Sequence, residues 1–365
     1  MYRLALVLSL AILSGCVTPR VSYEPAASDQ EVTDAEVEGG DQLYPAVLAG
    51  RWGYVDRRGQ MVISPQFESA SDFFEGRAAV QMDGKWGYIT PSGQWVVEPR
   101  YASAAPFSEG RGRVSVGEGL SLRYGFVDVA GREVVPPVLY FALDYSEGLA
   151  LAQVSRERSE FQVLFRVSSE FVFLNRAGTV AFEVRPEAVS AASFSGGLAP
   201  FEKDQGALRA TTWGYLDRDG AVAIAPDFDG PAFRHTDGLA RIGVDGQMGF
   251  VNEDGEVVIA PAYVLALPFA DGLAPVQNAA GEWGFVDASG ALVVEPQYLA
   301  ALAFSGGRAA VQTEAGWGYV DASGDLVVPA TYTRAESFRN GLARVYSGRL
   351  LRYIDADGET VWAQP

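Results

Sequence analysis

Aspartate or asparagine recurs in this sequence at the first position of an Asx-x-x-Gly pattern, and its side-chain oxygens are potential calcium ligands. The copies begin at Asp56, Asp128, Asp217, Asn252, Asp287, Asp321 and Asp355. A hard cation requires several oxygen ligands from one loop, whereas each turn that begins with aspartate holds at most one further acidic residue. An Asx side chain also caps its own turn, and glycine accepts a positive φ angle. The pattern therefore predicts short hairpin turns and no metal site.

Few other residues are candidates for catalysis. His235 is the only histidine and Cys16 the only cysteine, so neither a transition-metal site nor a catalytic triad can be completed. Glu75, Glu109 and Glu147 precede glycines at intervals of 34 and 38 residues, which does not place them face to face as an acid–base pair. No phosphate loop, Rossmann fingerprint or nucleophile elbow is present. We expect turn residues, a surface histidine, no catalytic residue, no cofactor and no enzymatic activity.

Most of the chain repeats one short sequence. Residues 317–332 read WGYVDASGDLVVPATY, and residues 283–298 read WGFVDASGALVVEPQY. An aromatic–Gly–aromatic step, with Met248 as the first residue in one copy, occurs seven times, mostly at intervals of 34 or 35 residues; two worn copies carry Val172 and Arg352 in the glycine position. The seven steps contain Trp52, Gly53, Trp86, Gly87, Gly125, Trp213, Gly214, Gly249, Trp283, Gly284, Trp317 and Gly318. A fixed period of this length indicates a repeat architecture.

Each repeat predicts three β-strands. A Trp-Gly strand alternates aromatic side chains on one face, a β-branched strand ends at a proline, and a third strand alternates small and apolar residues, as at Ala274 and Val276. With 41 glycines and 19 prolines, the chain is expected to be all-β, a tandem array of about nine three-stranded meander units. We expect a curved or superhelical array, because 34 residues fall short of the about 40–45 of a four-stranded propeller blade. A closed β-propeller is the alternative.

The glycine after each tryptophan requires a structural reason, because glycine within a strand costs about 0.5–1 kcal/mol relative to alanine. A β-bulge, or an aromatic ring lying over the bare backbone, would supply that reason. The fixed repeat phase of the tryptophans favours packing in the core over stacking on sugars. We therefore interpret the Trp-Gly pairs as structural.

These features resemble the WG-repeat, or KWG-repeat, proteins of bacteria. The resemblance rests on the Trp-Gly step, the Asp-x-x-Gly turn, the Val-Val-x-Pro-x-Tyr run and the Phe-x-x-Gly-Leu-Ala segment, and it covers roughly residues 50–360. Thr90 in one aspartate position and Phe171-Val172 in one Trp-Gly position depart from the pattern. The resemblance implies an all-β repeat array, often in surface or secreted proteins, and it implies no reaction.

Residues 1–15 are typical of a signal peptide. Arg3 is followed by an apolar run, 4–13, that is too short to span a bilayer. The segment Leu13-Ser14-Gly15-Cys16 resembles a bacterial lipobox, which implies cleavage between Gly15 and Cys16 and a lipid on Cys16. An ordinary signal peptide with a chance cysteine is the alternative. Val17 in place of aspartate resembles the sorting pattern of outer-membrane lipoproteins, so we expect an outer-membrane or cell-surface location.

The acidic composition bears on the partners. Residues 16–41 are rich in Asp and Glu and lack apolar periodicity, which predicts a disordered tether before a repeat domain at 42–365. A net charge of −18 leaves no basic stripe for nucleic-acid phosphates. We expect membrane attachment through the lipid on Cys16 and a scaffold surface for an envelope protein partner. The alternatives are carbohydrate or peptidoglycan binding, or an envelope enzyme with its site in a propeller mouth or groove.

The spacing of the repeats predicts where a partner would dock. The intervals from Gly125 to Val172 and from Val172 to Gly214 are 47 and 42 residues, with the additional residues near 152–170 and 202–212. Insertions in a repeat array fall in loops, often on the binding face. The first insertion suggests a lengthened hairpin with an apolar face, and a drifted repeat without function is the alternative. The candidate docking residues are Arg156, Arg158, Phe161, Leu164 and Phe165.

Overall fold

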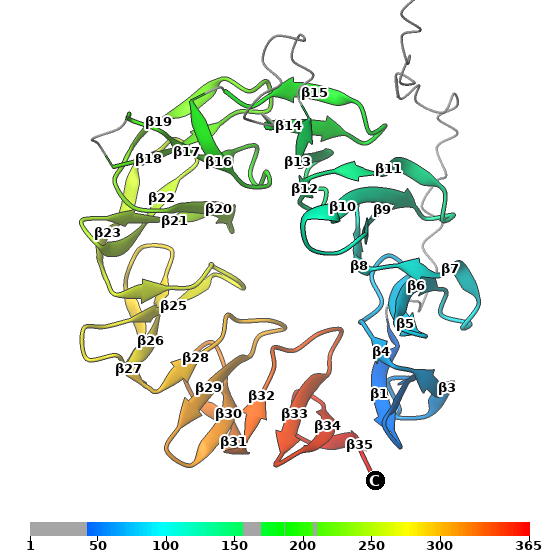
Figure 1. The fold of residues 1–365 in the computed structure, drawn as a ribbon. Helices are drawn as coiled ribbons and strands as arrows, with labels where there is room; N and C mark the ends of the chain where they lie inside the picture. The colour runs from blue at the N-terminus through cyan, green and yellow to red at the C-terminus, as the bar shows by residue number, and fades with distance from the viewer. Residues whose placement is uncertain (1–41, 156–168, 186, 207–209) are drawn as a thin grey trace, which may run out of the picture.

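The described part of the computed structural model is a ring of antiparallel β-sheets (Figure 1). It comprises residues 42–155, 169–185, 187–206 and 210–365, so the predicted signal peptide and tether lie outside it. The strands of this part form nine sheets, which we call blades 1–9 in chain order. Among the described residues, no helix is long and apolar enough to cross a membrane.

Within each blade, consecutive strands are neighbours in an antiparallel meander. Blade 1 contains β1 (Tyr44–Leu48), β2 (Arg51–Val55) and β3 (Met61–Phe67). Blade 2 contains β4 (Ser69–Ala70), β5 (Ala78–Met82), β6 (Lys85–Ile89) and β7 (Trp95–Tyr101). Blade 3 contains β8 (Ser103–Ser108), β9 (Arg111–Val116), the 3-10 helix η2 (Gly119–Ser121), β10 (Arg123–Asp128) and β11 (Glu133–Leu139). Blade 4 contains β12 (Phe141–Ala142), β13 (Leu149–Ser155), β14 (Ser169–Asn175) and β15 (Val180–Glu183).

The other half of the ring repeats the arrangement. Blade 5 contains β16 (Ala188–Ala191), β17 (Ala199–Lys203), β18 (Thr212–Leu216) and β19 (Val222–Phe228). Blade 6 contains β20 (Ala232–Thr236), β21 (Leu239–Val244), β22 (Gln247–Asn252) and β23 (Val257–Tyr263). Blade 7 contains β24 (Leu265–Ala266), β25 (Leu273–Gln277), β26 (Trp283–Asp287) and β27 (Leu292–Tyr298). Blade 8 contains β28 (Ala300–Ala301), β29 (Ala309–Thr313), β30 (Gly316–Val320) and β31 (Leu326–Tyr332), and blade 9 contains β32 (Arg334–Ala335), β33 (Ala343–Ser347), β34 (Leu350–Ile354) and β35 (Thr360–Ala363).

The prediction of an all-β fold with nine repeated units is confirmed, but the expected number of strands per unit was one too small. Among the described residues, eight blades have four strands and only blade 1 has three. The additional strand lies innermost and is often only two residues long; in β4, Ser69 pairs with Gln81 and Ala70 with Val80. A pair of residues leaves no alternating pattern to detect. Because this strand is so short and the turns are tight, 34 or 35 residues suffice for a whole blade.

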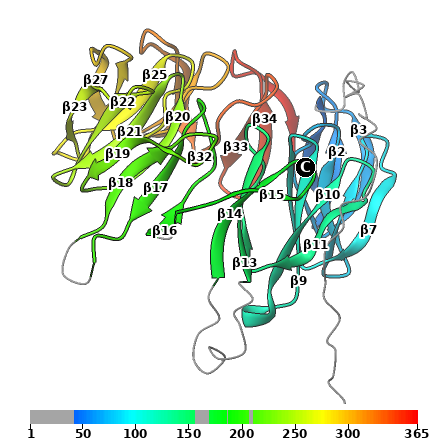
Figure 2. The same ribbon diagram turned by 90° about the horizontal axis from the view of Figure 1, so that it is seen from above.

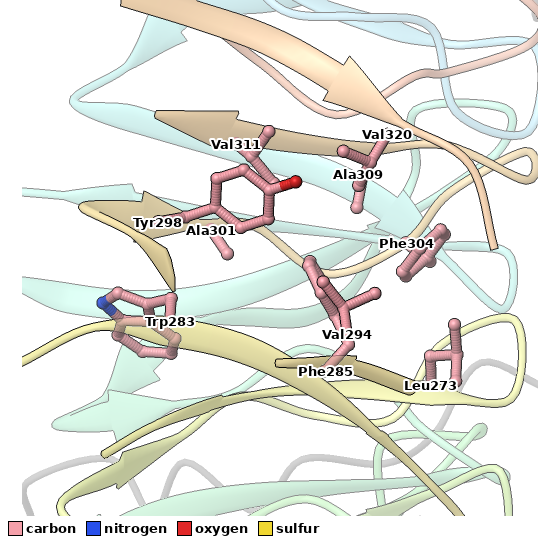
Figure 3. Close-up of a cluster of buried hydrophobic side chains, with 10 residues drawn as sticks. All are labelled: Leu273, Trp283, Phe285, Val294, Tyr298, Ala301, Phe304, Ala309, Val311 and Val320. Carbon is pink, nitrogen blue, oxygen red and sulfur yellow. The ribbon is translucent and has the colours of Figure 1, made fainter. Parts of the chain in front are cut away.

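The ring is closed, so the structure is the β-propeller that the sequence left as the alternative to an open superhelix. Each of nine apolar clusters lies between two neighbouring blades, and the ninth joins blade 9 to blade 1 through Tyr44, Val55, Leu351 and Tyr353. Figure 3 shows the cluster between blades 7 and 8, where Phe285 and Phe304 meet. A blade has two apolar faces, and an open array would expose one at each end. Closure removes both from water.

One aromatic pair marks every boundary between blades. The second aromatic residue of the aromatic–Gly–aromatic step packs against a ring in the next blade, as Tyr54 does against Phe73 with centroids 4.8 Å apart. The other pairs are Tyr88–Phe107, Phe126–Tyr145, Phe173–Phe194, Tyr215–His235, Phe250–Phe269, Phe285–Phe304, Tyr319–Phe338 and Tyr353–Tyr44. The tryptophans are less central: Tyr319 is fully buried, whereas Trp317 two residues earlier is only partly buried.

The glycine of the step lies opposite a β-bulge in the outermost strand. In blade 7, Trp283 pairs with Tyr298 and Phe285 with Val294, so Gly284 alone faces the three residues between them, which include Pro296. A Cβ atom on Gly284 would lie 2.4 Å from the Val294 carbonyl oxygen and 2.7 Å from the Pro296 nitrogen. The six other glycines of the step meet an equivalent carbonyl at 2.3–2.6 Å. The bulge supplies the steric requirement that the sequence implied, and it also tolerates proline, which donates no ladder hydrogen bond.

Candidate functional site

The two rims of the ring differ in construction, and each is a candidate surface. The rim that holds the connection from the first to the second strand and the turn from the third to the fourth is called the turn face here. The opposite rim, the link face, holds the links between blades and the hairpins from the second to the third strand.

The turn face is built on eight tight turns near the ring centre. In blade 2, Phe74 donates to the Arg77 carbonyl and accepts from its amide, and both residues between them, Glu75 and Gly76, have positive φ angles. The equivalent central pairs begin at Glu109, Glu147, Gly196, Asp237, Asp271, Gly306 and Asn340. Blade 1 has no such turn, because its described residues have no inner strand.

The acidic residues of these turns clamp neighbouring blades together. The Glu75 carboxylate accepts hydrogen bonds from the backbone amides of Glu109 and Gly110, both at 2.7 Å. Glu109 accepts in turn from the amides of Glu147 and Gly148, both at 2.6 Å. Single hydrogen bonds of 2.9–3.1 Å link other pairs of turns, from the carboxylates of Glu147, Asp237 and Asp271 to the amides of Gly197, Gly272 and Gly307. The prediction that Glu75, Glu109 and Glu147 are turn residues is confirmed, and their carboxylates accept hydrogen bonds from backbone amides of the next blade.

Serine hydroxyl groups, each on the residue directly before the central pair of a turn, form a second set of contacts between blades. Ser108 donates to the Tyr145 carbonyl, Ser146 to the Phe194 carbonyl and Ser305 to the Phe338 carbonyl, at 2.7–2.8 Å. The turns at Ser108-Glu109 and Ser146-Glu147 are therefore tied to the next blade through both a side-chain donor and a side-chain acceptor. The other turns named above use one of the two, so these polar side chains take part in contacts within the fold.

The Asx-x-x-Gly turns on the same face behave as predicted. Asp56 Oδ1 accepts from the amides of Arg58 and Gln60 at 2.8 Å, and the other copies repeat this cap. At Asp287 the Ser289 hydroxyl, the largest influence, lowers the pKa of the carboxyl group. Among the described residues, no group of three or more His, Cys, Asp or Glu side chains is placed to hold a metal ion.

His235 is buried, so the expectation of a surface histidine was wrong. It occupies the position held by phenylalanine in most blades and packs against Tyr215 at 5.1 Å. Burial lowers the pKa of its imidazole, while a contact of Nε2 with the Asn252 carbonyl at 3.2 Å acts in the opposite direction. Its Nδ1 atom has no hydrogen-bond partner among the described residues. The burial of His235 could have been predicted from its position in the repeat, where most blades have phenylalanine, but not from the residue type.

An ionic latch replaces the missing turn of blade 1. Asp72 in blade 2 forms ion pairs with Arg339 and Arg344 of blade 9, and Arg339 also donates to the Phe73 carbonyl at 2.8 Å. Burial opposes the charge on Arg344, but Tyr353, Asp72 and Glu336 hold the pKa of its guanidinium above the usual value. Blades 9 and 2 are thus joined directly across the gap that blade 1 leaves.

The link face departs from the repeat in blades 3, 4 and 5, and by a smaller amount in blade 7, where residues 278–282 join β25 to β26. The hairpin from the second to the third strand is two residues long in blade 2, at Asp83-Gly84, but blade 3 inserts η2 there. In blade 4, β13 and β14 pair as far as Ser155 and Ser169, beyond the five-residue strands of blade 2. In blade 5, β17 ends at Lys203 and β18 begins at Thr212. Figure 2 shows the ends of β13 and β14 on this side of the ring.

Apolar side chains are exposed beside these lengthened connections. Leu120 in η2 is fully exposed, and Val138, Phe141 and Val189 are exposed at the neighbouring links and inner strand. Phe141 also packs edge-on against Phe171, with ring centroids 6.4 Å apart. Exposed Val264, Leu265 and Leu299 continue this character on the links of blades 7 and 8. The link face therefore carries exposed apolar side chains on its links and hairpins.

The predicted functional residues lie outside the described residues. These are Gly15 and Cys16 at the cleavage site and Arg156, Arg158, Phe161, Leu164 and Phe165 in the first insertion. The structure adds Leu120 and Phe141, which the sequence interpretation missed. The interval of 38 residues from Gly87 to Gly125, four longer than the repeat, is the signal that could have indicated η2.

Solved structures with a similar fold include a eukaryotic initiation factor. It is 10% identical, with a TM-score of 0.63, and the match covers 89% of this chain and 96% of that chain. BamB from Moraxella catarrhalis is 13% identical with a TM-score of 0.36, covering 89% and 94% of the two chains. Prolyl oligopeptidase B from Galerina marginata is 12% identical with a TM-score of 0.42, covering 90% and 56%. The first likeness supports the fold alone, and the other two carry no argument about function.

The sequence comparisons identify the repeat. No curated protein matches the chain. A profile described as WG containing repeat matches seven segments, at 52–86, 86–119, 124–155, 213–247, 248–279, 283–315 and 317–348. These segments cover more than half of the chain and coincide with the Trp-Gly strands and their neighbours. The chain therefore belongs to the family of WG-containing repeat proteins.

Proposed function

We propose that this protein is a lipid-anchored component of the bacterial cell envelope that binds another envelope protein through its link face. The observation that carries the proposal is the grouping of three lengthened connections in blades 3, 4 and 5 on one rim. The two-residue hairpins of blades 1, 2, 6, 8 and 9 indicate that the fold does not require the additional residues. The exposed Leu120 and Phe141 beside them supply apolar area of the kind found in the centre of protein interfaces.

The properties of the turn face also favour the link face as the binding surface. Its acidic and hydroxyl side chains are engaged in contacts between blades, which leaves them unsuited to acid–base chemistry. A rigid ring that holds variable loops on one rim is a common arrangement for binding. The function proposed is therefore docking, and not turnover.

Replacement of residues 156–168 by Asp-Gly tests the docking proposal. The short hairpin in blade 2 closes through Asp83 and Gly84, both at positive φ, so the same pair can join Ser155 to Ser169. We expect an unchanged melting temperature, because neighbouring blades keep their interfaces. We also expect loss of the envelope protein recovered by crosslinking in intact cells. Recovery of the same partner in the same yield would refute the proposal.

The membrane anchor is tested separately. The proposal places a lipid on Cys16, following a segment that resembles a lipobox. Cys16→Ser should move the protein from the membrane fraction to the soluble fraction and change its electrophoretic mobility. If the variant stays in the membrane with unchanged mobility, the lipid anchor is refuted, while docking through the link face remains open to its own test.

A further inference from the structure

A cavity of about 310 Å³ lies between blades 5, 6 and 7. Its lining includes Trp213 from blade 5, Phe233, Arg234, Thr236 and Arg241 from blade 6, and Pro268 from blade 7. A volume of this size is at the lower end of the range for small-molecule sites. The lining combines aromatic rings with two arginines. Comparison with equivalent positions in other blades shows that, among the described residues, these arginines lack the ion pairs found there.

Arg241 has two counterparts at the same position of the repeat, three residues after the turn glycine. These counterparts are Arg113 and Arg344. Each pairs with an aspartate of another blade, and that aspartate directly precedes the aromatic residue that packs at the boundary between blades. Arg113 contacts Asp144 at 2.7 Å, and Arg344 contacts Asp72. At the boundary between blades 6 and 7 the corresponding position is Pro268. Arg113 and Arg344 therefore each have a carboxylate partner at this repeat position, whereas Arg241 has a proline there.

Arg234, which also lines the cavity, departs from the charge pattern of the repeat as well. It occupies the same repeat position as Asp72 and Asp144, so a positive charge stands where those blades carry a negative one. Its partner position in blade 5 is Pro200, which cannot form an ion pair. Within the described part of the chain, neither Arg234 nor Arg241 is within ion-pairing distance of a carboxylate. Two arginines without counter-ions thus line one cavity.

The remaining contacts of Arg241 orient its guanidinium without neutralising it. Nη1 donates to the Ala266 carbonyl at 2.8 Å, and the guanidinium carbon lies 4.0 Å from the centre of the Phe233 ring. Burial lowers the pKa of Arg241, and the nearby Tyr215 side chain opposes this effect only in part. A guanidinium carries five N–H donors, so several remain for a ligand.

We propose that this cavity binds a small organic carboxylate, which pairs with Arg241 and Arg234 while its apolar or ring-shaped body lies against Trp213 and Phe233. The ligand carboxylate takes the place of the aspartate that the repeat supplies elsewhere. Planar carboxylates match the fork of an arginine, and a cavity with aromatic walls accommodates a body of several carbon atoms. This inference does not rest on docking at the link face, since it is argued from the charge pattern at Arg234 and Arg241 and from the residues that line the cavity.

Calorimetric titration of the full-length protein tests the site with benzoate as the probe and benzamide as the neutral control. We expect saturable benzoate binding with a Kd of about 1 mM or tighter, and binding of benzamide at least about tenfold weaker. Equal binding of the two compounds, or no saturable binding of benzoate, would overturn the proposal.

The repeat itself provides the decisive variant. Pro268→Asp restores the missing carboxylate, so it should raise the melting temperature and weaken benzoate binding at least about tenfold. Arg241→Gln should weaken binding similarly, whereas Arg113→Gln, at the equivalent but already paired position, should leave it unchanged. Undiminished binding in Pro268→Asp would contradict the proposed role of Arg241. Tighter binding of a glutamate residue capped at both ends than of benzoate would assign the carboxylate to a protein chain and overturn the small-molecule occupant.

Discussion

Substitution of Gly284 by alanine is the sharpest test of how the repeat is built. The new Cβ would lie 2.4 Å from the Val294 carbonyl oxygen and 2.7 Å from the Pro296 nitrogen, both of which are backbone atoms. Real Cβ atoms do not approach backbone this closely, so either strand β26 or the bulge in β27 must move. The perturbation is confined to one atom and adds no charge or polarity.

Two opposing effects set the expected magnitude. Alanine restricts the unfolded chain more than glycine and so favours folding by about 0.4–1 kcal/mol. Overpacking a tight site costs about 1–3 kcal/mol or more, and the contact with two backbone atoms places Gly284 at the upper end. We expect net destabilisation of about 2 kcal/mol, which corresponds to a fall in Tm of about 3 °C for a domain of this size.

Thermal melts followed by circular dichroism measure this effect, and blade 9 supplies the matched control. Arg352 occupies the glycine position there, pairs directly with Ala363, and Tyr353 pairs with the adjacent Trp362, so no bulge opposes it. Arg352→Ala should therefore change stability by less than about 1 kcal/mol. A Gly284→Ala protein that melts at or above the wild-type temperature would refute the steric explanation of the glycine.

Three further variants probe the contacts between blades. Asp72→Asn should destabilise the protein by about 2–3 kcal/mol in urea unfolding, because Arg339 and Arg344 lose the carboxylate that they share and Arg344 keeps only the longer ion pair with Glu336, at 3.6 Å; wild-type stability would show that the latch does not hold the ring closed. Glu109→Gln should cost about 1–2 kcal/mol in the same assay, since one of the two amides that the carboxylate binds loses its acceptor; an unchanged midpoint would count against the clamp. His235→Phe should raise the melting temperature below about pH 6.5 and have a smaller effect at pH 8. The pKa of the buried imidazole is lowered, so the unfolded chain binds the proton more readily and wild-type stability falls as the pH drops below that of ordinary histidine; equal pH profiles of the two proteins would exclude this linkage.

The sequence predicted the repeat and its strands because those features are periodic. Alternation placed the aromatic, β-branched and small–apolar strands correctly, and the glycine after tryptophan indicated a bulge. Val172 and Arg352 were recognised as worn copies, and the structure shows that both blades pair regularly at that position. The strands and their order within a blade can therefore be predicted from the local sequence pattern.

Features that depend on contact between blades were not predictable in the same way. A two-residue strand such as β4 has no period of its own, and its existence depends on pairing with β5. Closure depends on how much each blade rotates relative to the next, which no single repeat encodes. The latch between Asp72 and Arg344 joins positions 272 residues apart, and Arg241 is distinguished only by the proline in the next blade.

Site-specific photo-crosslinking in living cells tests the proposed docking function most directly. A photoreactive amino acid at Leu120 would report on the link face, and one at Asp219, in an exposed turn of blade 5, would report on the turn face. We predict that position 120 captures one discrete envelope protein, that position 219 does not, and that replacing residues 156–168 by Asp-Gly abolishes the capture. Equal capture from both positions, or capture that survives the replacement, would contradict the assignment of the link face as the binding surface.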